Sequence, residues 1–130
     1  IELGMREPVI RVGNLSARRD FSDVRDVVRA YAALMEKGKA GETYNVGAGK
    51  AVEIRRILDM ILSLAKKEIR VETDPARMRP VDVPVLEADI RKLQACTGWR
   101  TEIPLEKTIE ETLNYWRETL RQLGKKTPAV

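Results

Sequence analysis

Hydrophobic residues recur along the chain with two periods, and these predict alternating strands and helices. Residues 8–13 (PVIRVG) alternate between apolar and polar side chains, which indicates a short strand ended by the turn signal Gly13-Asn14. Residues 18–24 (RRDFSDV) form a second extended candidate. From about residue 24 the spacing becomes three and four, which predicts a helix ended by Gly38 and Gly41. Its apolar stripe comprises Val24, Val27, Val28, Tyr31, Leu34 and Met35.

The middle of the chain predicts a strand, a helix and a second strand. Residues 42–47 (ETYNVG) and 69–73 (IRVET) are the strand candidates. The helix between them has one apolar face, made of Ile54, Ile57, Leu58, Ile61, Leu62 and Ala65. Such a βαβ unit normally has parallel strands and a right-handed crossover.

Two further helices complete the predicted α/β lobe. The first covers residues 89–96, with Asp89 as its N-cap and Gly98 as its stop. The second has Pro104 in its first turn and a buried stripe of Leu105, Ile109, Leu113, Trp116 and Leu120. Trp99 and Trp116 are interpreted as packing residues. We therefore predict one small α/β lobe over residues 1–123 and a flexible tail over 124–130.

Composition narrows the chemistry. Hydrophobic residues make up 43% of the 130 residues and charged residues 34%, which is typical of a folded domain. No apolar run reaches membrane-spanning length, so no membrane partner is expected, and no signal peptide is visible. The chain begins with Ile1, so it can be a piece of a longer protein. The absence of histidine and the single cysteine exclude an internal disulfide and predict no metal site. A cytoplasmic location fits, and the net charge of +4 favours an anionic partner.

Arginines lie close to acidic residues in two stretches of the sequence, and these arginines are candidates for binding an anion. Arg19 stands just before a predicted helix, and Arg79 stands in a loop after a predicted strand, where ligand contacts are common. A guanidinium offers paired donors that match phosphate oxygens, and Asp82 can accept a hydrogen bond from a ribose hydroxyl. The pattern alone favours the alternative in which Arg18 or Arg19 pairs with Asp20 or Asp23, and Arg79 with Asp82, as surface ion pairs.

The stretch YNVGAGK at 44–50 has a G-x-G turn between a predicted strand and a predicted helix. The third glycine of a dinucleotide-binding loop is absent, since Val52 occupies its place. We interpret this stretch as a tight strand-to-helix turn. No histidine is available to activate a nucleophile, and aromatic residues, at 5%, do not interleave with a basic stripe, so nucleic acid is not an expected partner.

Four stretches carry a family resemblance. GNLSARRDFSDVRDVVRAY, GETYNVGAGKAVEIRRIL, DPARMRPVDVPVLEADIRKLQACTGW and EIPLEKTIEETLNYWR occur in this order. Together they resemble the C-terminal half of extended short-chain dehydrogenase/reductases of the NAD-dependent epimerase/dehydratase family. The similarity covers residues 8–120 and is nearest to GDP-mannose 4,6-dehydratases and GDP-4-keto-6-deoxy-mannose reductases.

The resemblance implies a substrate lobe that closes over a nucleotide sugar bound on a Rossmann domain. By this resemblance Arg19 and Arg79 contact the diphosphate or nucleotide of a GDP-sugar, and Asp82 contacts the ribose. In the parent enzyme, a nucleotide-sugar dehydratase or reductase, the cofactor is NADP or NAD. Severed from its Rossmann domain, the lobe would expose an apolar face, so a homo-oligomer is expected.

The departures from the family limit what this chain does alone. The glycine-rich cofactor loop is absent, and no tyrosine has a lysine four residues on, so no catalytic or cofactor-binding residue is assigned. We expect a lobe that binds but does not catalyse alone. The alternatives are the corresponding part of a UDP- or dTDP-sugar epimerase or dehydratase, and a stand-alone module that binds an anionic ligand.

Overall fold

The computed structural model describes residues 1–78 and 82–125 of the chain. Its strands are β1 (Val9–Val12), β2 (Arg18–Asp20), β3 (Ala51–Glu53), β4 (Arg70–Thr73) and β5 (Val85–Leu86). Its helices are α1 (Val24–Lys37), α2 (Ile54–Ser63), α3 (Arg91–Thr97) and α4 (Leu105–Lys125), with a 3-10 turn, η1, at Pro75–Arg77. This mixture of helices and small sheets confirms the predicted α/β class. The α4 helix includes residues 124 and 125 of the predicted tail, and residues 126–130 lie outside the described part.

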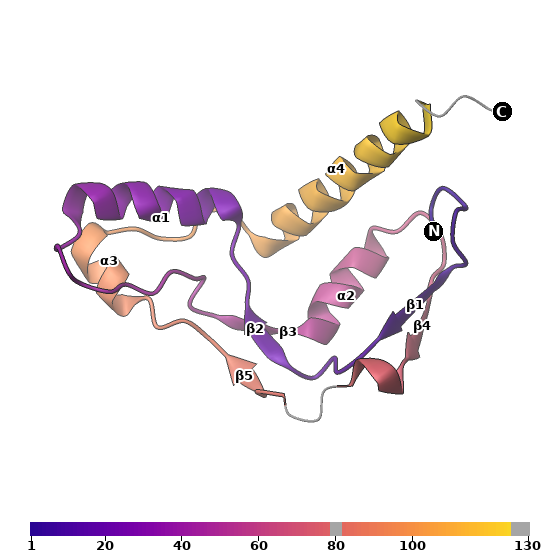
Figure 1. Ribbon diagram of the computed structural model, residues 1–130, viewed down its shortest axis with the longest axis horizontal. Helices are drawn as coiled ribbons and strands as arrows, with labels where there is room; N and C mark the ends of the chain where they lie inside the picture. Colours follow the sequence, from indigo (N-terminus) through magenta and orange to yellow (C-terminus); the bar gives the residue numbers. More distant parts are fainter. Residues whose placement is uncertain (79–81, 126–130) are drawn as a thin grey trace.

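The strands form two small sheets. In Figure 1, α1 and α3 lie at the left, and the β1–β4 pair lies at the right, beside α2. In one sheet β1 and β4 pair in parallel, with Val9 opposite Arg70. In the other, β2 lies between β3, its antiparallel partner, and β5, its parallel partner. The strand predicted over residues 69–73 is β4, and it follows the α2 helix as expected. Its parallel partner is β1 and not the segment 42–47.

The strand predicted over residues 42–47 is wrong. Within the described residues this segment has no strand alongside it. Tyr44 and Val46 instead pack against a buried cluster from α1, α3 and the residues that flank α3. Apolar alternation indicates a segment with one covered face. Because helices can cover that face as well as a sheet can, the pattern did not require a neighbouring strand.

The α1 helix begins and ends where the sequence predicts. The Asp23 carboxylate caps it by accepting a hydrogen bond from the Arg25 backbone N–H at 2.8 Å. At the other end, the Gly38 N–H donates to the Leu34 carbonyl, and a Cβ on Gly38 would lie 2.4 Å from that oxygen. Only a residue without a side chain fits this close approach.

The buried face of α1 differs from the predicted stripe. Its buried residues are Asp26 and Ala30, whereas four of the six stripe residues are more than half exposed: Val24, Val28, Tyr31 and Met35. Periodicity shows that these residues share a face, but it does not show what covers that face. No segment within residues 1–78 and 82–125 covers this face of α1, which lies along the edge of the molecule (Figure 1).

A compact core holds α1 against α3. Ala30, Ile90, Leu93 and Trp99 form it, and Trp99 is 5% exposed, which confirms its predicted packing role. The Trp99 indole N–H donates to the Asp26 carbonyl at 3.0 Å, so the large ring is buried with its polar atom satisfied. Gly98 ends α3 in a left-handed conformation with φ 73°, as its position predicts.

The α4 helix packs on α2 with only part of its predicted stripe. Leu105, Ile109 and Leu113 are half-buried, but Trp116 is 54% exposed, so its predicted burial is wrong. Trp116 instead lines an apolar groove of about 470 Å³ between α2, α4 and the first residues of the chain. None of the helices in residues 1–78 and 82–125 has the length and apolar character needed to cross a bilayer.

Candidate functional site

Arg19 lies in the middle of β2, the central strand of the three-stranded sheet. Its backbone stands opposite Val52 of β3 and Leu86 of β5, so strands on both sides fix its position. Side chains alternate along a strand, which sends Arg18 and Arg19 to opposite faces. The Arg18 guanidinium donates to the Ala51 carbonyl at 2.9 Å and so ties β2 to β3, whereas Arg19 lines the cleft described below.

The Arg19 guanidinium holds the segment around Asp82 with both terminal nitrogens. Nη2 donates to Oδ1 of Asp82 at 2.6 Å, and Nη1 donates to the Val83 carbonyl at 2.8 Å. The Arg19 and Asp82 side chains are 27% and 20% exposed, so the pair is shielded from much of the solvent. The structure thus brings together two of the three predicted site residues. The third, Arg79, lies outside the described residues.

Asn14 holds the second oxygen of the Asp82 carboxylate. Its Nδ2 donates to Oδ2 of Asp82 at 2.8 Å, although 68 residues separate the two in the chain. The other end of the same amide is also fixed, because Oδ1 accepts from the backbone N–H and the hydroxyl of Ser16, at 2.9 Å and 2.7 Å. The sequence indicates Asn14 only as part of the turn signal after residues 8–13, and no local pattern predicts this contact.

These side chains border one cleft of about 440 Å³, a volume within the range of small-molecule sites. Three guanidinium groups, Arg11, Arg19 and Arg77, and the Asp82 carboxylate face it together. Arg11 pairs with Glu7 and Glu72, and Arg77 pairs with Asp74. The remaining lining comes from the end of β1, from the segment between β1 and β2 and from the start of α2: Val12, Gly13, Asn14, Leu15, Ala17 and Ile54. Guanidinium forks beside an acceptor suit a ligand with an anionic part and a hydroxyl part.

The alternative pairing of Arg18 or Arg19 with Asp20 or Asp23 is wrong. Asp20 instead accepts from the backbone N–H groups of Ala48, Gly49 and Ala88, at 2.7, 2.9 and 3.1 Å. Gly47 packs directly on this carboxylate, since a Cβ there would lie 2.8 Å from Oδ2 of Asp20. The YNVGAGK stretch is therefore a turn packed against Asp20, and its glycines permit close packing.

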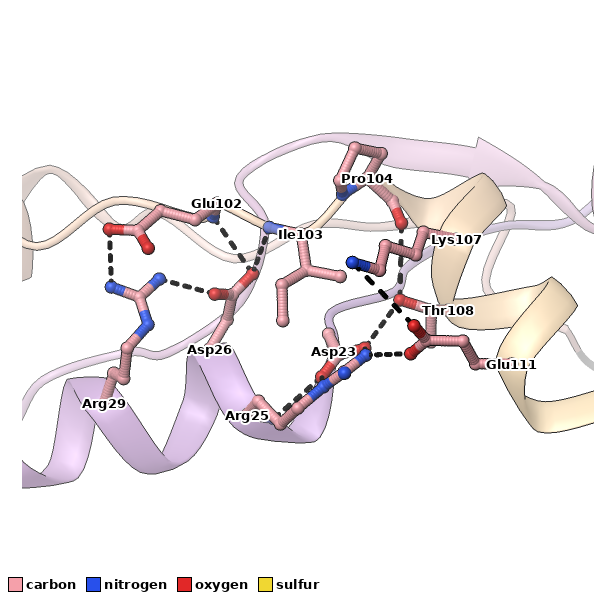
Figure 2. Close-up of polar contacts among 10 residues, drawn as sticks. All are labelled: Asp23, Arg25, Asp26, Arg29, Glu102, Ile103, Pro104, Lys107, Thr108 and Glu111. Carbon is pink, nitrogen blue, oxygen red and sulfur yellow. Dashed lines mark hydrogen bonds and ion pairs between the residues drawn. The ribbon is translucent and has the colours of Figure 1, made fainter. Parts of the chain in front are cut away.

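Two other aspartates join α1 to the start of α4 (Figure 2). Asp26, which is fully buried, accepts from the Arg29 guanidinium at 2.5 Å and from the backbone N–H groups of Glu102 and Ile103, both at 3.1 Å. Asp23 accepts from the Arg25 guanidinium and, at 2.7 Å, from the Thr108 hydroxyl. The structure thus places both carboxylates at the junction of α1 with the start of α4, and neither lines the cleft beside Arg19 and Asp82.

Hydrogen bonds keep both of these carboxylates charged. Burial alone raises the pKa of Asp26, but the Arg29 guanidinium and the two backbone N–H groups outweigh burial and hold the pKa below its ordinary value of 3.8. The Arg25 guanidinium is the main cause of the lowered pKa of Asp23, and Thr108 adds to it. Among residues 1–78 and 82–125, no three histidine, cysteine, aspartate or glutamate side chains gather closely enough to hold a metal ion.

Comparison with known proteins matches nearly the whole chain to one family. The sequence model of the family described as GDP-mannose 4,6 dehydratase matches residues 1–112. A GDP-6-deoxy-D-mannose reductase from Pseudomonas aeruginosa is 33% identical over 119 residues, which are 92% of this chain and 39% of the relative. The chain thus spans about two fifths of the length of that relative.

Solved structures give the same result for the fold. The structure of RMD from Pseudomonas aeruginosa complexed with NADPH superposes with a TM-score of 0.83 and 30% identity, over 91% of this chain and 39% of that one. The UDP-glucose 4-epimerase of Thermotoga maritima, solved with UDP-glucose, gives a TM-score of 0.71 and 30% identity, over 86% and 35%.

Proposed function

We propose, on the premise that the chain belongs to the GDP-mannose 4,6-dehydratase family of extended short-chain dehydrogenase/reductases, that it binds the nucleotide diphosphate of a GDP-sugar. The observation that carries this proposal is the cleft in which Arg19 and Asp82 meet from distant parts of the chain. The Pseudomonas aeruginosa relative, a GDP-6-deoxy-D-mannose reductase, supports the choice of a GDP-sugar.

The site residues act by binding and orienting the nucleotide. Arg19 donates to the acceptor-only carboxylate of Asp82, and a diphosphate presents the same kind of oxygen acceptor to the same fork. Asp82 then accepts from a ribose hydroxyl, and Arg79, one residue before Pro80, supplies a second guanidinium to the diphosphate. The two arginines clamp the anion, and the cleft walls exclude water from it.

The chemistry of the parent enzyme would reside in residues that this chain does not contain. The chain has no Tyr-x-x-x-Lys pair and no glycine-rich cofactor loop, so we propose that it does not catalyse alone. NADP or NAD would be held by a Rossmann domain joined to this lobe and would supply hydride transfer at the sugar. The NADPH in the solved RMD structure supports that cofactor.

Two surfaces of the chain fit contact with such a domain. The exposed stripe of α1 is made of Val24, Val28, Tyr31 and Met35, and residues 42–47 pair with no strand among the described residues. An uncovered apolar helix face is suited to packing against another layer of secondary structure. In the isolated chain, a second copy is the available partner for the stripe.

The isolated chain is therefore expected to self-associate through α1. The double substitution Tyr31→Glu and Met35→Glu should weaken the dimer at least tenfold. It would place negative charges within an apolar contact, close to the same charges of the second copy. Sedimentation equilibrium over a range of chain concentrations measures this. Leu123→Glu adds a charge to an apolar residue on α4 that is 56% exposed, close to the 57% of Tyr31, and is the control. A monomer at all concentrations, or a dimer broken by the control alone, would contradict the prediction.

Titration calorimetry tests the choice of nucleotide. GDP, UDP and dTDP are titrated into the wild-type chain and into Arg79→Ala. We expect GDP to bind most tightly and Arg79→Ala to weaken it by at least tenfold, because a charge-assisted hydrogen bond to the diphosphate is lost. Preference for UDP or dTDP would favour the epimerase or dTDP-sugar dehydratase alternative. Equal binding of all three and of inorganic phosphate would favour a stand-alone anion-binding module.

A further inference from the structure

We infer that the apolar groove between α2, α4 and the first residues of the chain docks an acidic amphipathic helix of a partner protein. The groove has a volume of about 470 Å³. It shares no lining residue with the cleft beside Arg19, so the inference goes beyond the proposed function and does not depend on it.

The groove leaves large apolar side chains uncovered. Trp116 on α4 and Leu3 and Met5 near the start of the chain are each at least 49% exposed, and all three line the groove. The half-buried Ile61 of α2 and Leu113 of α4 belong to the same lining. Exposed apolar side chains gathered in a groove beside two packed helices are suited to a third helix, which would cover them as in a helix bundle.

Cations border this apolar lining: Arg6, Lys66, Lys67 and Arg121. Among the described residues, Glu2 is the only carboxylate that lines the groove, and it is already neutralised. The Arg117 guanidinium donates to both of its oxygens, at 2.7 Å and 2.5 Å, and is the main reason that the pKa of Glu2 is lowered to about 2. By contrast, the Arg6 and Lys66 side chains make no hydrogen bond or ion pair within residues 1–78 and 82–125. The border is therefore positive, with charges available to a partner.

This pattern of charge selects the occupant. A helix with one apolar face and acidic flanks would lay its apolar face on Trp116 and its carboxylates against the bordering cations. A second copy of the chain complements the border less well. Its exposed apolar helix, α1, has more basic than acidic residues: Arg25, Arg29 and Lys37 against Asp26 and Glu36. A membrane surface also fits less well, because a groove between two helices receives a ridge and not a flat layer.

The test titrates two synthetic helical peptides without tryptophan into the full 130-residue chain. Both are about 18 residues long and share one leucine face, and their flanks carry glutamate in one peptide and lysine in the other. Tryptophan fluorescence reports docking in the groove, because Trp99 is buried and Trp116 is exposed. We expect the glutamate peptide to shift the emission to shorter wavelength and to bind at least tenfold more tightly than the lysine peptide. The preference should fall as salt is added.

Charge reversal at the groove separates the bordering cations from net charge. Lys66→Glu together with Lys67→Glu should abolish the preference for the glutamate peptide. Lys39→Glu together with Lys50→Glu is the matched control, since it changes the net charge equally at two exposed lysines outside the groove and should leave the preference unchanged. If the Lys66 and Lys67 variant does not fold, Arg121→Glu replaces it and should lower the preference by about threefold.

Four results would overturn the inference. One is equal binding of the two peptides, or binding of neither at millimolar concentration. Another is a preference that both double variants lose equally, which would show that net charge attracts the peptide. An emission shift of the chain alone as its concentration rises, lost in Leu120→Ser, would identify a second copy as the occupant. A shift caused by phosphatidylglycerol vesicles and not by the glutamate peptide would identify a membrane surface.

Discussion

Replacing Asp26 with alanine is expected to lower the free energy of unfolding by about 3 kcal/mol, the lower end of the range for breaking a buried ion pair. The substitution leaves the Arg29 guanidinium without its buried partner and the N–H groups of Glu102 and Ile103 without an acceptor. The lower end applies because the Arg29 side chain is 39% exposed and can be hydrated. Thermal unfolding followed by circular dichroism should show a midpoint lower by about 10 °C.

Asp59→Ala is the matched control, because Asp59 is exposed on α2 and makes no hydrogen bond or ion pair within the described residues. It should change the unfolding free energy by less than about 0.5 kcal/mol. An Asp26→Ala chain as stable as this control would show that the buried network does not hold α1 to α4.

Acid should weaken the same network. The folded-state pKa of Asp26 lies below its ordinary value of 3.8, so its contribution is complete above that value and is lost as the pH falls through the folded pKa. Asp26→Asn removes the charge at every pH. The stability difference between wild type and Asp26→Asn should therefore shrink as the pH is lowered from 6 to 3, and a constant difference would contradict the assigned ionisation.

Replacing Arg19 with alanine is expected to weaken GDP binding about 100-fold, which corresponds to about 3 kcal/mol for two hydrogen bonds to a charged group. Stability should fall as well, by about 1–3 kcal/mol, because the Arg19–Asp82 pair is shielded from much of the solvent and Asp82 loses its charged partner. Titration calorimetry measures the affinity, and thermal unfolding checks that the fold is intact.

Arg19→Lys and Arg70→Ala separate shape from charge at this site. Lysine keeps the charge but loses the planar fork, so we expect it to recover only part of the affinity. Arg70, whose side chain is 72% exposed on β4, carries the same charge away from the cleft, and its removal should leave GDP binding nearly unchanged. Equal losses in Arg19→Ala and Arg70→Ala would show that net charge, and not the cleft, attracts the nucleotide.

Local signals in the sequence predicted the elements whose limits are set by single residues. Gly38 and Gly98 end α1 and α3 as predicted, because each helix end depends on the absence of one side chain. Residues 42–47 and the α1 stripe were predicted less well, because a hydrophobic pattern shows which residues share a face and not what lies against it. The partner surface must be known before such a pattern identifies a core.

The site was predicted in part for a similar reason. Arg19 and Asp82 were identified through the family resemblance, and the structure brings them within 2.6 Å of each other. Asn14 was missed, because its contact with Asp82 spans 68 residues and depends on how β1 and β2 stand relative to the segment before β5. No local spacing in the sequence encodes that relation.

We propose that the cleft between the turn after β1, β2 and Asp82 binds a nucleoside diphosphate. The most direct test is to titrate GDP into the ¹⁵N-labelled chain and follow the backbone amide shifts by NMR. We expect the largest shifts at Asn14, Arg19, Arg77 and Asp82, with little change along the exposed stripe of α1 or in the groove between α2 and α4. Shifts centred on that stripe or groove, or no shifts at millimolar GDP, would show that the nucleotide does not bind in this cleft.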